Sequence, residues 1–465
     1  MSFFILQEHY LLRGYSKLPF ALVHPNYSNT EFFTKDEYKL VLDCDGNTDI
    51  DYENLSERQK TIFRNMLNAG IIRQCEKGET LNPEQEYILY PSKFKARVQW
   101  SITGRCNYLC KHCFLSAPSY KGSDVSLEKC IRILDQLCEC GIYVVAVTGG
   151  EPLVHNGFYQ LLEEIRKRDM KLEVIYTNCA LVDNKLLDKL DELELHPSFN
   201  VSFDGIGCHD WLRGIDGAEQ KTIDTIKLLK QRGFSVTVSM SLHKGNISSL
   251  PETVRLLGEL GCSHLKTSGM NMQGNWIEQR DNYLSNKELF DYLIDYIPQY
   301  FKDGAPISMQ MGLALDYDNK RKKARIPAVI GGGNEKAGNN PICGVISNDL
   351  YIGADGKVLP CMSFAGHPLE KKFESVFDMD LKDIINDSYY SSVAKVSCKE
   401  CIEHNKKCTD CKYRWLCCSG CRAGACDNNR TDYYAIDESY CTFFENGYYE
   451  KVLGLIKEYI ADSHE

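Results

Sequence analysis

The sequence has no long apolar run. No stretch of its 465 residues approaches the roughly 20 apolar residues that a membrane-spanning helix needs. The short apolar run at residues 3–6 has no basic segment before it and no small-residue cleavage site after it, so we expect no secretory signal peptide. We therefore expect a cytoplasmic protein without a membrane partner.

The sequence also has no excess of basic residues. Acidic residues outnumber basic ones by 64 to 54, which gives a formal net charge of −10. Proteins that bind nucleic acid draw much of their affinity from Lys and Arg side chains that neutralise phosphates. We therefore predict no nucleic-acid partner.

Cysteine, in contrast, is abundant, with 22 residues in the chain. Many of these cysteines lie in closely spaced groups. In a long chain without a secretory signal, such groups indicate metal ligands before disulfides. The length predicts two or three domains.

Residues 1–92 form the first predicted unit. Residues 32–51 have a strand-like pattern with a turn at Asp45-Gly46, and residues 54–75 have the pattern of a helix that Gly70 ends, followed by a short strand. This order of strands and short helices predicts a small winged-helix-like module.

Residues 93–326 alternate apolar, β-rich runs with amphipathic helices. Such alternation is typical of an α/β domain with parallel strands, and six strands indicate a partial, TIM-like (βα)6 barrel. The predicted strands are residues 97–103, 143–149, 172–178, 199–205, 236–242 and 264–269. Residues 327–342 are rich in Gly and Asn and are predicted to be a linker, and residues 343–465 form a cysteine-rich C-terminal domain.

Three cysteines, Cys106, Cys110 and Cys113, follow the first predicted strand of the barrel. Parallel α/β sheets place their active sites at the carboxyl ends of the strands. Three thiolates bind three irons of a four-iron cluster and leave the fourth iron open to a ligand. The alternatives are a structural zinc site and unrelated buried thiols.

This CxxxCxxC loop resembles the signature of the radical S-adenosylmethionine (SAM) enzymes. The resemblance implies that the open iron binds SAM, and that further SAM contacts lie at the ends of the next strands. Those residues are Gly149, Gly150, Glu151 and Pro152 after the second strand, Asn178 after the third, and Ser202 and Asp204 after the fourth. Strand-end caps and turns are the competing roles of the polar members.

The resemblance also implies the chemistry. An electron from the reduced cluster cleaves SAM to methionine and a 5'-deoxyadenosyl radical, which abstracts a hydrogen atom from the substrate. The segment with His209, Asp210 and Arg213 recurs in this family, but we assign it an ion-pair and loop-packing role. Cys208 and Cys179 are candidate hydrogen donors to a substrate radical.

The C-terminal cysteines resemble the seven-cysteine SPASM extension of radical SAM enzymes, which carries two auxiliary iron-sulfur clusters. The resemblance assigns Cys343, Cys361 and Cys421 to auxiliary cluster I and Cys408, Cys411, Cys417 and Cys441 to auxiliary cluster II. Three [4Fe-4S] clusters are therefore expected, one of which binds SAM. Zinc knuckles are the alternative.

Auxiliary cluster I has only three ligands in this pattern. Some relatives supply a fourth cysteine six residues after the first, where this chain has Asp349. The fourth ligand is therefore Cys398, Cys401 or Cys426, or the site is open to a substrate thiolate.

The first 92 residues resemble the precursor-peptide recognition element of enzymes that mature ribosomally made peptides. Such a module binds a leader peptide as an added strand. The same kind of fold also binds DNA, but Asp43, Asp45, Asp49, Asp51 and Glu53 make that surface unfavourable for phosphates. The expected partners are a precursor peptide and an electron donor of the flavodoxin or ferredoxin type.

Together these features predict a radical SAM peptide maturase. The first hypothesis is an intramolecular thioether of the sactionine or ranthipeptide type, because an auxiliary cluster that lacks one ligand can bind a cysteine thiolate. Carbon-carbon crosslinking and epimerisation are alternatives, as is an iron-sulfur or zinc DNA-binding regulator. Sulfatase maturation is disfavoured because Met362 stands where those relatives carry a catalytic Asp.

Overall fold

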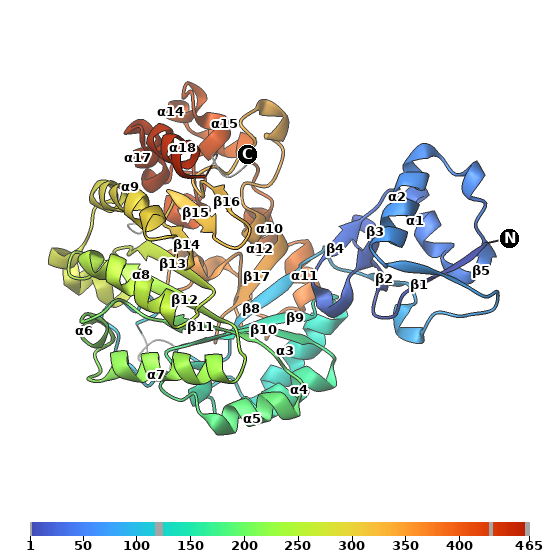
Figure 1. The fold of residues 1–465 in the computed structure, drawn as a ribbon, viewed down its shortest axis with the longest axis horizontal. Coiled ribbons are helices and arrows are strands. Elements are labelled where there is room, and N and C mark those ends of the chain that lie inside the picture. The colour runs from blue at the N-terminus through green and yellow to red at the C-terminus, as the bar shows by residue number, and fades with distance from the viewer. Residues whose placement is uncertain (1, 117–123, 427–430, 461–465) are drawn as a thin grey trace.

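The computed structural model describes residues 2–116, 124–426 and 431–460. Along the chain, a small N-terminal module is followed by a large sheet covered by helices and then by a C-terminal region of short helices (Figure 1). None of the helices in this described part combines the length and the apolar character that a membrane span requires.

The N-terminal module contains two small sheets and two helices. The strands are in the orders β5-β1-β6 and β4-β3-β2-β7. The elements are β1 (Phe3–Leu6), β2 (Leu11–Tyr15), β3 (Leu18–Val23), β4 (Thr30–Phe32), α1 (Lys35–Leu42), β5 (Asp45–Asp49), α2 (Glu57–Asn68), β6 (Ile72–Cys75) and β7 (Ile88–Tyr90). The predicted helix before Gly70 is confirmed as α2, and Gly70 follows it with a φ of 67°.

The predicted strand-like character of residues 32–51 is partly wrong, because helix α1 lies there. The Thr34 backbone N–H donates to the Glu37 carboxylate over 2.7 Å, which is half of an N-terminal capping box. Tyr38 and Val41 are buried at a helical spacing. The alternation of apolar and polar residues in this segment is therefore helical in period. Asp45 and Gly46 belong to β5, and the predicted turn is present there as a local one: Asp45 Oδ1 accepts from the Asn47 and Thr48 N–H groups, and Gly46 has a φ of 77°.

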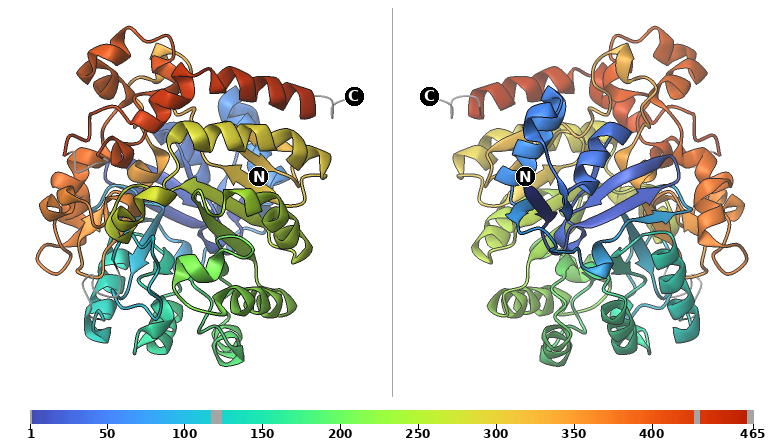
Figure 2. Two further views of the ribbon diagram at one scale, coloured as in Figure 1. Left: turned by 90° about the vertical axis from the view of Figure 1, so that its left-hand side faces the viewer. Right: turned by 90° about the vertical axis from the view of Figure 1, so that its right-hand side faces the viewer.

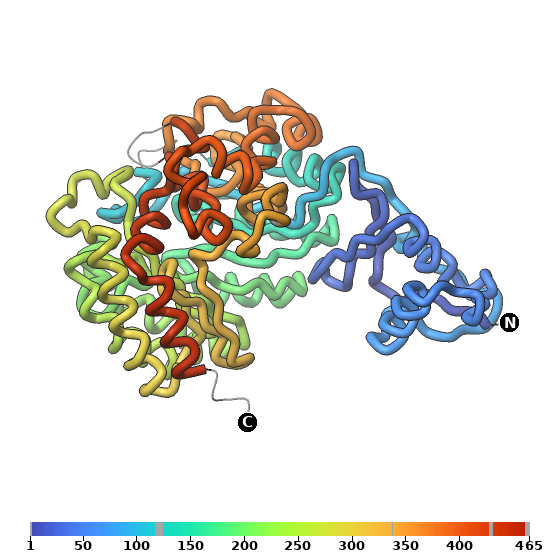
Figure 3. Tube along the Cα trace, turned by 90° about the horizontal axis from the view of Figure 1, so that it is seen from above, coloured from blue at the N-terminus to red at the C-terminus, as the bar shows by residue number. Residues whose placement is uncertain are grey.

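Aromatic side chains fix the module against the junction of α3 and β9 in the central domain. The rings of Tyr27 and Tyr143 stack with centroids 5.1 Å apart. The Tyr15 hydroxyl donates to the Gly141 carbonyl over 3.3 Å, and the Ser92 hydroxyl donates to the Cys140 carbonyl over 2.9 Å. Figure 3 shows the module projecting from one side of the body. It is therefore docked at the amino-terminal ends of the central strands.

The central domain is built on an eleven-stranded sheet in the described residues. The six predicted strands are confirmed as neighbours in chain order, β8 to β13, all parallel. The sheet strands are β8 (Arg97–Ser101), β9 (Val144–Thr148), β10 (Lys171–Thr177), β11 (Ser198–Ser202), β12 (Val236–Leu242), β13 (His264–Gly269), β14 (Ser308–Met311), β15 (Leu315–Asp318), β16 (Lys323–Arg325), β17 (Asp349–Ile352) and β18 (Val358–Leu359).

The parallel sheet is larger than the predicted six strands. β14 pairs in parallel with β13, and β17, from the C-terminal region, pairs in parallel with β8. Sequence analysis missed β14 because its residues, Ser-Met-Gln-Met, contain no β-branched or aromatic side chain. β16 and β18 lie at opposite edges, so the sheet is open.

Helices cover one face of this sheet, as Figure 2 shows. Val98 and Trp100 of β8 are fully buried on this face, whereas Gln99 between them points to the other face and is only partly buried. The helices of the central domain are α3 (Leu127–Glu139), α4 (Phe158–Lys167), α5 (Asn184–Glu192), α6 (His209–Arg213), α7 (Ala218–Gln231), α8 (Leu250–Glu259) and α9 (Asn286–Lys302). The opposite face, which we call the inner face, is polar: Tyr176, Asn200 and Thr237 are aligned across it.

The C-terminal region consists mostly of short helices. It packs on α9, where the Phe290 and Phe443 rings lie 5.3 Å apart. The helices are α10 (Gly344–Asn348), α11 (Leu381–Asn386), α12 (Tyr389–Ala394), α13 (Cys398–His404), α14 (Lys406–Thr409), α15 (Arg414–Cys417), α16 (Arg422–Ala425), α17 (Glu438–Glu445) and α18 (Tyr448–Tyr459). The predicted linker is bound to this region, since the Ile330 backbone N–H donates to the Leu416 carbonyl over 2.8 Å.

Replacing Tyr143 tests the docking of the N-terminal module. We expect Tyr143→Ala to increase amide hydrogen exchange in residues 11–27 severalfold, because the stacked ring and the hydroxyl that accepts from Tyr90 are lost. Tyr159→Ala, on α4, is the matched control. Equal exchange in the two variants would show that the module is held by other contacts.

Candidate functional site

The three-cysteine loop lies at the carboxyl end of β8, packed against the segment that follows β9. The Gly150 N–H donates to the Thr103 carbonyl and the Glu151 N–H donates to the Arg105 carbonyl, both over 2.9 Å. A Cβ atom at Gly150 would lie 2.2 Å from the Arg105 oxygen, and one at Gly149 would lie 2.6 Å from the Thr103 oxygen. Both glycines are therefore required for this close approach of two backbones.

Glu151 joins this loop to the next strand. Its side chain is only 1% exposed, and its carboxylate accepts from the Asn178 backbone N–H over 2.8 Å and from the Thr177 hydroxyl over 3.0 Å. Burial raises the pKa of Glu151 to about 7, and these hydrogen bonds act in the opposite direction. The geometry therefore gives Glu151 a structural role, and the contact with SAM that the sequence predicts for it stays a prediction.

The cysteine thiols of the loop receive hydrogen bonds of different kinds. The Tyr108 backbone N–H donates to Cys106 Sγ over 3.4 Å, and the Arg213 guanidinium donates to Cys110 Sγ over 3.7 Å. Burial raises the pKa of Cys106 to about 12. Burial also raises the pKa of Cys110, and Arg213 opposes that rise. Metal coordination deprotonates such thiols.

Asp204 is fully buried beneath this loop. Its carboxylate binds the Arg213 guanidinium, with Nε 2.6 Å from Oδ2, and accepts from the Ser241 N–H over 3.1 Å. Burial alone would raise the pKa of Asp204, but the Arg213 charge holds it well below its usual range. Arg213 thus forms the ion pair predicted for the segment that holds His209, Asp210 and Arg213. Asp204 and Ser202 as ribose contacts stay predictions.

Three further candidates lie at the ends of β10 and β11. Asn178 Nδ2 donates to Asn107 Oδ1 over 2.8 Å and lies 4.0 Å from Cys106 Sγ. Cys179 is fully buried, whereas Cys208 is partly exposed and its thiol donates to the Gly245 carbonyl over 3.3 Å. Of the two candidate hydrogen donors, the geometry leaves only Cys208 accessible.

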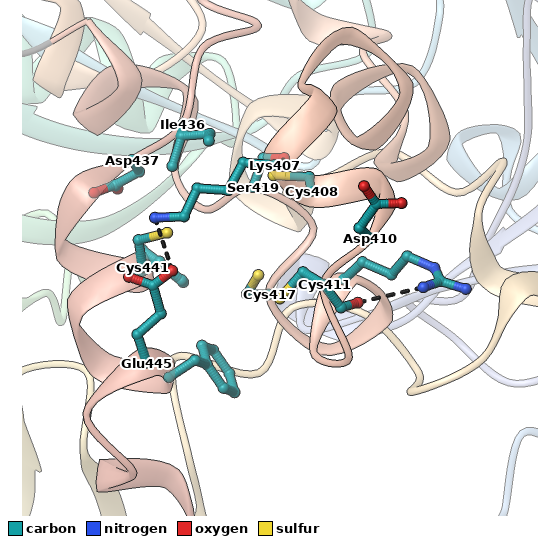
Figure 4. A pocket seen from close by; sticks show the side chains of 13 residues that line it. Lys407, Cys408, Asp410, Cys411, Cys417, Ser419, Ile436, Asp437, Cys441 and Glu445 are labelled. Atoms are coloured by element: carbon teal, nitrogen blue, oxygen red, sulfur yellow. Dashed lines mark hydrogen bonds and ion pairs between the residues drawn. The ribbon is translucent and has the colours of Figure 1, made fainter.

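The four cysteines assigned to auxiliary cluster II surround a cavity of about 200 Å³ (Figure 4). Cys408, Cys411 and Cys417 come from α14, α15 and the turn between them, and Cys441 comes from α17. The thiols thus enclose a space that fits a cluster.

Polar side chains complete the wall of this cavity. The Ser419 hydroxyl donates to Cys408 Sγ over 3.1 Å. Lys407 lies beside Cys441 and pairs with Glu445, with Nζ 2.7 Å from Oε1. Burial raises the pKa of Cys417 to about 12. Sequence analysis did not identify Ser419 or Lys407, because a lone Ser or Lys beside a cysteine carries no recognisable pattern.

The three cysteines assigned to auxiliary cluster I each precede a short helix, at Cys343, Cys361 and Cys421. Burial raises the pKa of Cys361 to about 11 and that of Cys421 to about 12, and the neighbouring thiols of the same group add to both shifts. The three thiols therefore share one environment.

Asp349 and the three candidate fourth ligands of cluster I have different surroundings, and Cys398 and Cys401 belong to the buried cluster against which Cys343 and Cys361 pack. Asp349 Oδ2 accepts from Arg97 Nε over 2.9 Å. Cys398 is hydrogen-bonded to Cys418, whose thiol lowers the pKa of Cys398, and Cys401 lies near Cys408 of the other site. The Cys426 carbonyl contacts His367 Nε2 at 2.6 Å.

Comparison with protein families accounts for this arrangement of sites. The model of the radical SAM superfamily matches residues 100–257, and that of the SPASM iron-sulfur cluster-binding domain matches residues 343–412. This chain is a radical SAM enzyme with a SPASM domain. Its cofactors are accordingly [4Fe-4S] clusters and SAM, and the thiols of the cysteine loop and of the four-thiol cavity are ligands of the kind that such clusters need.

Known relatives extend over most of the chain. The subtilosin biosynthesis protein AlbA of Bacillus subtilis (strain 168) is 27% identical over 77% of this chain and 73% of its own. The AdoMet-dependent heme synthase of Methanosarcina barkeri is 23% identical over 74% of this chain and 96% of its own. The structure of Streptococcus suis SuiB bound to precursor peptide SuiA matches with a TM-score of 0.62 at 16% identity, covering 95% and 100% of the two chains. The last likeness shows the shared fold.

Replacing Gly150 tests whether its close packing against the cysteine loop is needed for SAM binding. We expect Gly150→Ala to weaken SAM binding at least tenfold, because the new methyl group would displace the Arg105 carbonyl and the cysteine loop with it. Isothermal titration of reconstituted protein measures this. Gly454→Ala is the control, since nothing lies within 4 Å of that position, and equal affinity in both variants would contradict the assignment.

Replacing Cys417 tests the four-thiol cavity. After anaerobic reconstitution, we expect Cys417→Ser to contain about four fewer irons per chain than the unaltered protein, because a closed cluster needs all four thiolates. Cys262→Ser, a buried cysteine of the central domain, is the control. Retention of all iron in Cys417→Ser would remove this residue from the ligands.

Proposed function

We propose that this enzyme matures a ribosomally made precursor peptide and joins a cysteine sulfur of that peptide to a carbon of another residue. The observation that carries this proposal is the three-thiol site of Cys343, Cys361 and Cys421, whose expected fourth position is taken by Asp349. Since Asp349 is paired with Arg97, a substrate thiolate has a position to fill.

The place of this site in the fold supports the proposal. β17 pairs with β8, so the chain between Cys343 and Cys361 forms the edge of the central sheet. Gln99 of β8 donates to Met362 Sδ over 3.2 Å, and Gln99 belongs to the inner face. A peptide on the inner face would thus lie between the three-thiol site and the rim that carries Cys106, Cys110 and Cys113.

Bound SAM and its cluster supply the hydrogen-abstracting radical. The residues of the chain position the peptide beside them. Forming the thioether removes one hydrogen atom from carbon, which the 5'-deoxyadenosyl radical takes up, and one proton and one electron from the thiol. An iron-sulfur cluster held by Cys343, Cys361 and Cys421 would accept that electron. The peptide therefore loses two hydrogens for each bond made.

The N-terminal module supports a peptide substrate. Strands β4, β5, β6 and β7 are edges of its two sheets, and an edge strand can pair with an extended peptide through backbone hydrogen bonds. Ile88 and Leu89 on β7 are exposed, which gives such a peptide apolar contacts. AlbA takes part in bacteriocin biosynthesis and SuiB was solved with a precursor peptide, which favours the same class of substrate here.

Carbon-carbon crosslinking and epimerisation use the same machinery and are outcomes of the test. Met362, which has no acid-base group, disfavours sulfatase maturation. A low-potential flavodoxin or ferredoxin would supply the electron. The acidic surface and the enzyme domains disfavour a DNA-binding regulator.

Anaerobic co-expression with a short precursor peptide encoded beside this gene tests the proposal. We expect the product to lose two hydrogens and one alkylatable thiol, as mass spectrometry with iodoacetamide would show. Cys361→Ser should abolish this product but still release 5'-deoxyadenosine on reduction with SAM, and Cys106→Ala should abolish both. Unchanged peptide mass with altered stereochemistry, or a crosslink that leaves all thiols free, would contradict the thioether.

A further inference from the structure

Helix α6 lies directly against the cysteine loop. The Lys111 backbone N–H donates to the Leu212 carbonyl over 2.9 Å. Gly214, which ends the helix with a φ of 69°, approaches so closely that a Cβ atom there would lie 2.9 Å from the Leu109 oxygen. These backbone contacts fix the helix and the loop relative to each other, so a side chain on the inward face of α6 has a defined position beside Cys110.

That inward side chain is Arg213. Arg213 is only 8% exposed. Its guanidinium bridges two groups: Nε donates to Asp204 Oδ2 over 2.6 Å, and Nη1 donates to Cys110 Sγ over 3.7 Å. Asp204 is in turn held by the Ser241 backbone N–H, and its carbonyl accepts from Asn246 Nδ2 over 2.9 Å. The cation is therefore anchored at one end and directed at a thiol at the other.

The donors described for Cys106 are uncharged. Cys106 receives the Tyr108 backbone N–H and faces the Asn178 amide. Among the described contacts of Cys106 and Cys110, the guanidinium is thus the charged one. A charge in a buried site acts on its neighbours far more strongly than the same charge in water.

Hydrogen bonds to the sulfurs and local charge are among the factors that set the reduction potential of an iron-sulfur cluster. Adding one electron to the cluster adds one negative charge, and a fixed cation at the cluster ligand favours that state. We propose that Arg213 is a positioning residue that raises the reduction potential of the SAM-binding cluster through Cys110, and that Asp204 holds it there. This inference rests on the proposed binding of the cluster by Cys106, Cys110 and Cys113.

Redox titration of the reconstituted holoenzyme tests the inference. Dithionite supplies the single electron, and the electron paramagnetic resonance signal that changes on addition of SAM reports the cluster in question. For Arg213→Met we expect the equilibrium constant for reduction to fall at least about tenfold, which is a shift of 59 mV to lower potential for one electron. Arg213→Lys, which keeps the charge, should stay within about threefold of the unaltered enzyme.

Asp204→Asn separates charge from structure. Asn keeps an oxygen that can accept from the Arg213 guanidinium and so keeps the anchor, but it removes the compensating negative charge, so the potential should rise, opposite to Arg213→Met. A loosened loop would shift both variants in the same direction. Arg166→Met is the matched control and should leave the potential unchanged, since Arg166 of α4 forms a surface ion pair with Glu194.

Three results would overturn the inference: an unshifted potential in iron-loaded Arg213→Met, a shift of the same sign in Arg213→Met and Asp204→Asn, or loss of the SAM-responsive signal in Arg213→Lys. If Arg213→Met does not retain its iron, Asp204→Asn decides, since any result but a raised potential contradicts the proposal. None of these readouts needs a peptide, so the inference can stand where the proposed thioether fails.

Discussion

One buried carboxylate joins the loops of the active rim. The Glu151 backbone N–H donates to the Arg105 carbonyl of the cysteine loop. Its carboxylate accepts from Thr177 and Asn178 at the end of β10. A carboxylate this deeply buried is costly unless its oxygens are hydrogen-bonded. The carboxyl ends of β8, β9 and β10 are therefore locked together, and the position of the cysteine loop depends on a residue that need not touch a cofactor.

The auxiliary sites are built by a different principle from the rim. The rim residues inherit their positions from a parallel sheet with a large apolar core. At the four-thiol cavity, α14 and α15 have only four residues each, far below the length at which an isolated helix is stable in water. Their arrangement depends on contacts with one another and on what the thiols bind, so metal binding and folding are coupled there.

Sequence analysis identified the parts of this enzyme that have a strong local signal. Strands β8 to β13 were predictable because their apolar runs alternate with amphipathic helices, and the cysteine groups because their spacing is specific. Helix α1 was not, since its short apolar pattern fits a strand or a helix until the Thr34–Glu37 cap is seen. The hydrogen-bond partners of the cysteines could not be predicted from the sequence for another reason. Arg213 meets Cys110 across about a hundred residues of chain, and contacts at that separation follow from tertiary packing, which spacing in one sequence does not reveal.

The docking of the N-terminal module at the α3–β9 junction has a geometric consequence. Tyr143 lies at the amino end of β9, whereas the catalytic rim lies at the other end of the same five-residue strand, about 16 Å further along. The module is thus held at one end of the sheet strands and the reactive centre lies at the other, so the distance between them is fixed. For a peptide held on that module, the number of residues between its bound segment and its reacting segment would decide which side chain is modified. Lengthening that spacer would shift the modification to a different residue of the peptide.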